Sequence, residues 1–223
     1  MKEIKWDRMV LKRLLLLAAC GVMLQGIFYT NQTAFARKSI QAENTIQQGI
    51  AKEIVRFHVL ANSDSEQDQE LKMAVKERIV HYMQEILADA GSVQQAKEKI
   101  KDNLENIRKE AMQEIHRQGY SYPVEARLET CYFPMKSYGD CTFPAGDYEA
   151  LRICIGEAKG HNWWCVLYPN LCFVDSLHAV VPEEEKQELR NVLTEEEYDS
   201  LFDWQEDDYE VKFGFWELCK RIF

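Results

Sequence analysis

The chain has 223 residues, of which 46% are apolar and 29% are charged, and its formal net charge is −10. These fractions are typical of a globular protein and exclude a mostly disordered one. The acidic balance argues against nucleic-acid binding, because contacts with phosphate need clustered lysine and arginine. The length suits one domain preceded by a targeting segment.

Residues 1–36 have the pattern of a secretory signal peptide. Basic residues precede a mostly apolar run, Leu14–Tyr29, which is short for a membrane span of about 20 residues. Ala34-Phe35-Ala36 supplies a small-x-small motif, so we expect cleavage after Ala36. Two alternatives stay open. One is lipid attachment at Cys20, which the apolar residues beyond it disfavour, and the other is an uncleaved signal anchor.

A polar linker is expected at residues 37–53, and a single domain is expected over residues 54–223. Ile54–Ala61 is rich in β-forming residues and predicts a largely buried strand. Acidic and amide residues then alternate as in a calcium loop: Asn62, Asp64, Glu66 and Asp68. Such a loop needs glycine where Gln67 stands and a bidentate glutamate where Met73 stands, so calcium is rejected. Ser63 or Ser65 is instead expected to cap a helix.

Two long amphipathic helices are predicted next. The first has apolar residues spaced by three and four along one face (Leu71, Val75, Ile79, Tyr82 and Ile86), and Gly91 ends it. Ser92 and Gln95 predict a capping box for the second. The second helix has the same spacing at Val93, Ala96, Ile100, Leu104, Ile107, Ala111 and Ile115, with Gly119 just past its end.

From Val124 to Tyr132 the apolar period changes to two, which predicts a half-exposed strand. After turns, further strands are expected at Tyr148–Ile155 and Trp163–Leu167, joined by a loop at Gly156–Asn162. Two short acidic helices over 183–201 and a last strand over Tyr209–Phe215 complete the chain. The order β-α-α-β-β-β-α-α-β predicts an α+β fold, in which a mostly antiparallel sheet carries the two long helices on one face.

The stretch from Gly160 to Asp175 contains two cysteines around a turn. Tyr168-Pro169-Asn170 predicts a chain reversal that brings Cys165 and Cys172 close enough for a disulfide. One interpretation is a buried strand end with two inert thiols, and the other is a stapled loop on an exported protein. Because thiols tend to be oxidised after export, we predict the disulfide. No CxxC pair is present, so no structural zinc and no cofactor is predicted.

Four blocks of the chain resemble the stage II sporulation protein R family. They are RFHVLANSD (Arg56–Asp64), YFPMKSYGD (Tyr132–Asp140), PAGDYEALRICIGEAKG (Pro144–Gly160) and GHNWWCVLYPNLCFVD (Gly160–Asp175). The resemblance runs from about Ile54 to Asp175 and more loosely to the C-terminus. Four other cysteines lie outside the pair in the family motif, and their redox state stays open: Cys131, Cys141, Cys154 and Cys219.

The resemblance implies a secreted signalling protein of endospore formation. Members of the family are made in the forespore and exported into the space between the two membranes that separate it from the mother cell. There they activate a membrane-embedded aspartic-type peptidase, which processes the precursor of sigma-E. The resemblance therefore implies a protein partner, and it implies neither catalysis nor a small-molecule substrate.

The predicted partner-binding surface contains His161, Asn162, Trp163 and Trp164. Adjacent tryptophans on a strand point to opposite faces, so one is expected in the core and the other is a candidate anchor for the partner. His161 is expected to be exposed in its loop, whereas His58 is expected to be a core histidine. The alternative is that both tryptophans are core and the contact lies on the acidic helices around Glu183–Glu197.

The competing function is a secreted cysteine hydrolase that acts on peptide or cell-wall material. Its candidate nucleophiles are Cys165 and Cys172, with His58 or His161 as base and Asn62, Asn162 or Asp175 as the group that orients the base. The two cysteines occur as a pair in an exported domain, and no hydrolase or nucleotide-binding motif appears. We therefore predict that the protein is not an enzyme.

Overall fold

The computed structural model describes residue 41, residues 43–172 and residues 180–202. The chain divides into two compact units, residues 1–46 and 47–223. Residues 47–53 of the second unit are helical and Ile50 is fully buried. Over residues 47–53 the structure shows a helix where a polar linker was predicted, since Ile50 gives this segment an apolar side chain to bury. The predicted leader and the predicted strand at Tyr209–Phe215 lie outside the described residues.

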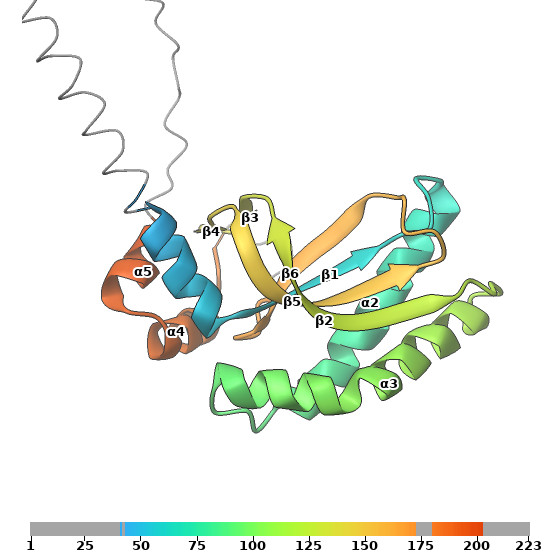
Figure 1. Ribbon diagram of the computed structural model, residues 1–223, viewed down its shortest axis with the longest axis horizontal. Coiled ribbons are helices and arrows are strands. Elements are labelled where there is room, and N and C mark those ends of the chain that lie inside the picture. Colours follow the sequence, from blue (N-terminus) through green and yellow to red (C-terminus); the bar gives the residue numbers. More distant parts are fainter. Residues whose placement is uncertain (1–40, 42, 173–179, 203–223) are drawn as a thin grey trace, which may run out of the picture. The chain divides into compact units, whose positions relative to one another are not determined.

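A four-stranded mixed sheet forms the centre of the second unit, with the strand order β2-β5-β1-β6 (Figure 1). Its strands are β1 (Val55–Leu60), β2 (Val124–Phe133), β5 (Gly146–Ile155) and β6 (Asn162–Tyr168). The fold is α+β, as predicted. Two of the three pairings are antiparallel, while β1 and β5 run parallel, so the sheet is mixed and the predicted mostly antiparallel pairing is matched only in part. The long connection between β1 and β5 permits this, because parallel neighbours need a crossover.

The helices α2 (Glu66–Leu87) and α3 (Val93–Arg117) cover one face of the sheet (Figure 1). Both were predicted, and their predicted apolar stripes are buried or packed against the core. The Ser65 hydroxyl caps α2 by accepting from Asp68 N, and the Ser92 hydroxyl caps α3 by accepting from Gln95 N. The predicted capping box of α3 is only half formed, because the Gln95 side chain accepts from Gly91 N instead of Ser92 N.

The segment after β2 folds into a hairpin, where only turns were predicted. It consists of β3 (Lys136–Tyr138) and β4 (Cys141–Phe143). Along β2 the buried side also changes. Val124 is buried on the helix face, but Tyr132, which was expected on the same face, is 62% exposed, whereas Phe133 on the other face is fully buried. The sequence period describes the strand but not which face is covered at each end.

Two short helices, α4 (Glu183–Val192) and α5 (Glu195–Ser200), agree with the predicted acidic helices. Thr194 and Glu197 form a complete capping box at the start of α5. Among the described residues, no helix is both long enough and apolar enough to cross a membrane.

The sheet face opposite α2 and α3 carries a buried cation. The guanidinium of Arg56 is enclosed by four aromatic rings, with Cζ 4.5–5.8 Å from the ring centroids of Phe133, Tyr138, Phe143 and Tyr148. Nη2 donates to the Tyr138 hydroxyl at 3.2 Å, while Nε and Nη1 have no hydrogen-bond partner among the described residues. Cation–π attraction and packing therefore hold the hairpin on the sheet.

This cluster predicts different effects for two substitutions of Arg56. Arg56→Ala should lower the free energy of unfolding by about 3 kcal/mol, because it leaves a cavity beneath the hairpin. Arg56→Met should lower it by less than about 1.5 kcal/mol, because it fills the space and removes a buried charge with unpaired donors. Urea denaturation of the two variants measures the difference. Equal losses would mean that the charge itself, and not the volume, is required.

Candidate interaction site at the start of strand β6

The site begins with the loop that follows β1. The carboxylate of Asp68, in the first turn of α2, accepts hydrogen bonds from Ser63 Oγ at 2.5 Å and Asn62 Nδ2 at 2.9 Å. These donors, Ser63 first, lower the pKa of Asp68. Two of the residues that resembled a calcium loop, Asn62 and Asp68, thus bond to each other. No cluster of three or more His, Cys, Asp or Glu side chains suited to a metal ion occurs within the described residues.

The loop between β5 and β6 interlocks with this first loop. Asn62 Oδ1 accepts from Glu157 N at 3.0 Å, and the Ala61 carbonyl accepts from Gly160 N at 3.0 Å. Glycine is needed at two points of this contact. Gly156 has a φ of +58°, and a Cβ there would lie 2.2 Å from Asn62 Oδ1, while a Cβ on Gly160 would lie 2.1 Å from the Ser63 carbonyl oxygen. Asn62, which the hydrolase interpretation offered as the group that orients a catalytic base, is instead one of the residues that join the two loops.

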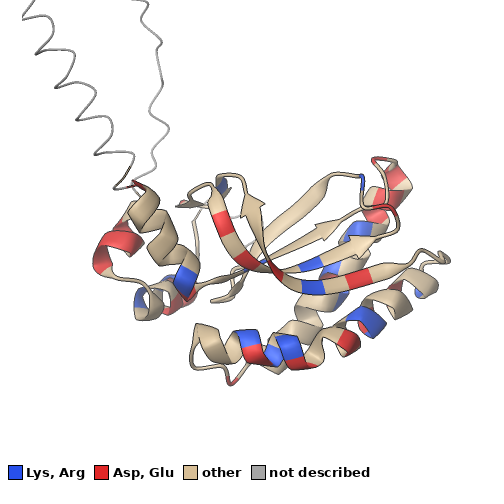
Figure 2. Cartoon of the chain, in the orientation of Figure 1, with Lys and Arg blue, Asp and Glu red and all other residues tan. Residues whose placement is uncertain are grey.

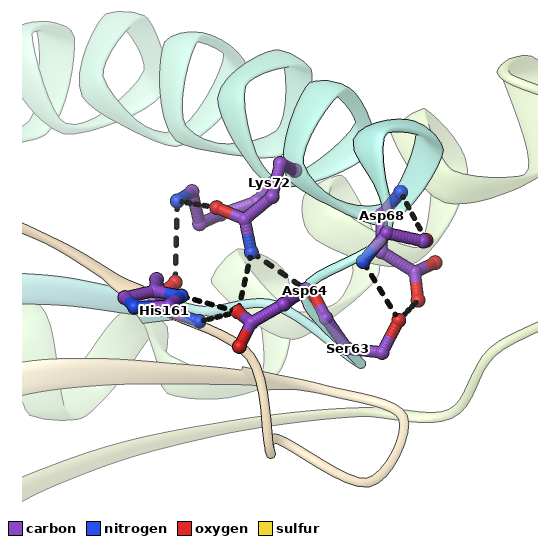
Figure 3. Close-up of polar contacts among 7 residues, drawn as sticks. Ser63, Asp64, Asp68, Lys72 and His161 are labelled. Carbon is purple, nitrogen blue, oxygen red and sulfur yellow. Dashed lines mark hydrogen bonds and ion pairs between the residues drawn. The ribbon is translucent and has the colours of Figure 1, made fainter.

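His161 is fixed at its backbone and exposed at its side chain. Asp64 Oδ1 accepts from His161 N at 2.6 Å and contacts the ring Nδ1 at 2.5 Å (Figure 3). These hydrogen bonds, the backbone one first, lower the pKa of Asp64. The ammonium of Lys72 donates to the His161 carbonyl at 3.2 Å and to Gln69 Oε1 at 2.5 Å. The His161 side chain remains 81% exposed, so an anchored loop presents it to solvent.

The two tryptophans lie on opposite faces of β6, as predicted, and both are half-buried. Trp163 faces the helices, where it packs edge-on against Phe57 at 5.9 Å and lies 5.0 Å from Lys76 Nζ. Trp164 faces the other way and stacks on His58 at 4.9 Å, with Phe133 edge-on at 4.7 Å. Trp163 therefore belongs to the border of the main core, and Trp164 to the opposite face, which holds the Arg56 cluster.

The predicted disulfide between Cys165 and Cys172 is present, with a Cα–Cα distance of 5.4 Å. It closes the turn after β6, in which Leu171 N donates to the Val166 carbonyl at 3.1 Å. Neither cysteine is therefore a free nucleophile in this structure. The free cysteines among the described residues are Cys131, Cys141 and Cys154, while Cys20 and Cys219 lie outside them.

One contact between a thiol and an imidazole could not be predicted from the sequence. Cys131 Sγ lies 3.5 Å from His58 Nε2, on the sheet face that holds the Arg56 cluster. Burial raises the pKa of Cys131 to about 11 and lowers the pKa of His58 to about 4. The contact joins β1 and β2 across β5, and only the strand order could have revealed it.

A cavity of about 510 Å³ lies at the far end of β6, between the C-terminal part of α2, the Tyr168-Pro169-Asn170 turn and α4. None of the four predicted partner-binding residues lines it. The anchored loop at the start of β6 therefore lies apart from this cavity.

Comparison with known proteins identifies relatives of the chain. The family model for stage II sporulation protein R matches residues 51–178. Stage II sporulation protein R of Bacillus subtilis (strain 168) is 33% identical over 186 residues, a match that covers 78% of this chain and 83% of the relative. No solved structure matches.

The contact between Gly156 and Asn62 predicts that alanine costs more stability at Gly156 than at Gly119, a glycine outside the two loops. Gly119→Ala should cost about 1 kcal/mol, because its φ of +84° strains alanine although nothing lies within 4 Å. Gly156→Ala should cost about 3 kcal/mol, since Asn62 must also give up its hydrogen bonds to make room. Urea denaturation compares the two variants. Equal losses would show that the contact with Asn62 contributes nothing to stability.

Proposed function

The chain belongs to the stage II sporulation protein R family, and on this basis we propose that it is an exported signal that activates a membrane-embedded peptidase. In this proposal the protein leaves the forespore through its leader and acts in the space between the two membranes. The peptidase, of the aspartic type, then processes the precursor of sigma-E. The protein itself catalyses nothing.

One observation carries the assignment of the contact surface: a rigid loop presents exposed and half-exposed side chains beside each other at the start of β6. Asn62, Asp64 and Lys72 hold the loop at its backbone. His161 and Trp164 are left available to a partner. A surface ordered before binding loses less conformational entropy on association, and a tryptophan offers a large area to desolvate.

A specific prediction distinguishes the two tryptophans. Both truncations should lower thermal stability, because Trp163 packs on Phe57 and Trp164 stacks on His58. At a temperature where both variants are still folded, only Trp164→Ala should reduce processing of the sigma-E precursor at least tenfold, because a central interface tryptophan contributes about 2 kcal/mol or more to binding. The assay co-expresses the chain, the cognate peptidase and the precursor, and follows the processed product.

Tyr132→Ala is the matched control, since Tyr132 is an exposed aromatic residue on the other edge strand. It should leave processing unchanged. If Trp164→Ala is folded and fully active, the contact surface lies elsewhere, and the acidic helices α4 and α5 become the next candidate.

The cysteine hydrolase is the second candidate function, and the thiols do not favour it. Cys165 and Cys172 are bonded to each other, which leaves Cys131 beside His58. A nucleophilic cysteine needs a lowered pKa, whereas the pKa of Cys131 is raised to about 11. His58 Nδ1 has no hydrogen-bond partner among the described residues, so no such group orients the ring as a base.

Alkylation tests this candidate directly. At pH 7.5, Cys131 should react with iodoacetamide about tenfold more slowly than free cysteine, because its smaller thiolate fraction outweighs the higher intrinsic nucleophilicity of that thiolate. Mass spectrometry of the native protein follows each site. A Cys131 that reacts faster than free cysteine, together with a Cys131→Ser variant inactive in precursor processing, would favour the enzyme.

A further inference from the structure

In the sheet formed by the described residues, β6 lies at the edge, so one side of its backbone has no neighbouring strand there. The Val166 carbonyl shows which groups point to that side, because it accepts from Leu171 N in the turn beyond the strand. Orientation alternates with a period of two in an antiparallel pair. The N–H and C=O groups of Trp164 and Asn162 therefore also point outward, away from β1.

The two halves of this edge differ. In the second half, the turn and the Cys165–Cys172 disulfide close over the strand, and residues 165–167 are buried. In the first half, residues 162–164 are each only half-buried. Within the described part of the chain, no hydrogen bond satisfies the outward backbone groups of Asn162 or Trp164. The open edge is thus a short, defined segment.

The side chains on both faces of this open edge suit the addition of another strand. β6 itself carries no charged residue, as the uncoloured ribbon in Figure 2 shows. A strand added here would place alternate side chains beside Trp164 on one face and beside Trp163 on the other, where aromatic cross-strand pairs are favourable. On the helix face the ammonium of Lys76 lies over the Trp163 ring and 3.8 Å from the exposed carboxylate of Glu77. Such an exposed pair contributes little, so the cation still complements an acidic side chain.

We propose that Asn162–Trp164 receives an extended segment of the partner protein by strand addition. The segment carries an acidic side chain toward Lys76 and an apolar one toward Trp164. The inference rests on the proposed function for the identity of the partner, the membrane-embedded peptidase. Main-chain hydrogen bonds to an edge strand, with alternate side chains read on each face, are a common mode of peptide recognition.

Amide hydrogen exchange of the exported chain, alone and bound to the detergent-solubilised peptidase, tests this mode. The amides of Asn162 and Trp164 should exchange readily in the free chain and at least tenfold more slowly in the complex. The amides of Trp163 and Cys165 point to β1 and should be slow in both states. A complex that forms without protection at Asn162 and Trp164 overturns strand addition but leaves the activating contact in place.

Two other outcomes also overturn the proposal. If no complex forms, the proposed function fails, and strand addition by the peptidase fails with it. If protection appears in the chain alone and rises with its concentration, the occupant of the edge is a second copy of this chain.

Two variants at Asn162 distinguish the contribution of its backbone N–H to peptidase binding from the contribution of its side chain. Proline is tolerated at the first residue of an edge strand, so Asn162→Pro removes one outward N–H without breaking the pairing with β1. It should weaken peptidase binding about tenfold more than Asn162→Ala, which keeps the N–H. Circular dichroism and melting confirm that both are folded. Equal affinities of two folded variants would exclude a main-chain hydrogen bond at this position.

Discussion

The architecture depends on the complete burial of β1. All six of its residues are shielded from solvent, including Arg56 and His58. A strand buried on both faces needs a cover on each. The helices α2 and α3 cover the side of Phe57, while aromatic residues from β2, β5, β6 and the β3–β4 hairpin cover Arg56 and His58. The position of Trp164 follows from this requirement, because its ring stacks on His58.

The same strand determines where the loops meet. β1 ends at Leu60, and Asn62, Ser63 and Asp64 follow at once at the point where the β5–β6 loop returns. Side-chain and backbone hydrogen bonds between the loops fix the chain up to His161. Such contacts limit the number of conformations that the exposed residues sample before they meet a partner. The rigidity of the surface is thus a consequence of where the central strand stops.

Local features of this fold could be predicted from sequence, whereas contacts between distant segments could not. The stripes of α2 and α3, their serine caps, Gly119 and the Cys165–Cys172 disulfide all depend on residues close together in the chain. The parallel pairing of β1 with β5 and the contact between Cys131 and His58 depend on strand order, which periodicity does not contain. The exposure of Tyr132 could not be predicted for a related reason: strand alternation gives two faces but not what covers them at each end.

The candidate site could be predicted from sequence only in part, for the same reason. His161, Asn162 and the two tryptophans are contiguous in the sequence, whereas Asp64 and Lys72 contact this loop only in the folded chain.

Among the described residues, the edge of β6 is open over only three residues, Asn162–Trp164. Long exposed edges promote association between copies of a chain, and natural sheets keep such edges short or covered. Here the disulfide-closed turn covers one half of β6. The remaining open segment offers outward main-chain groups from Asn162 and Trp164 alone among the described residues, so a segment added there, as proposed, must gain the rest of its affinity from contacts with the two tryptophans.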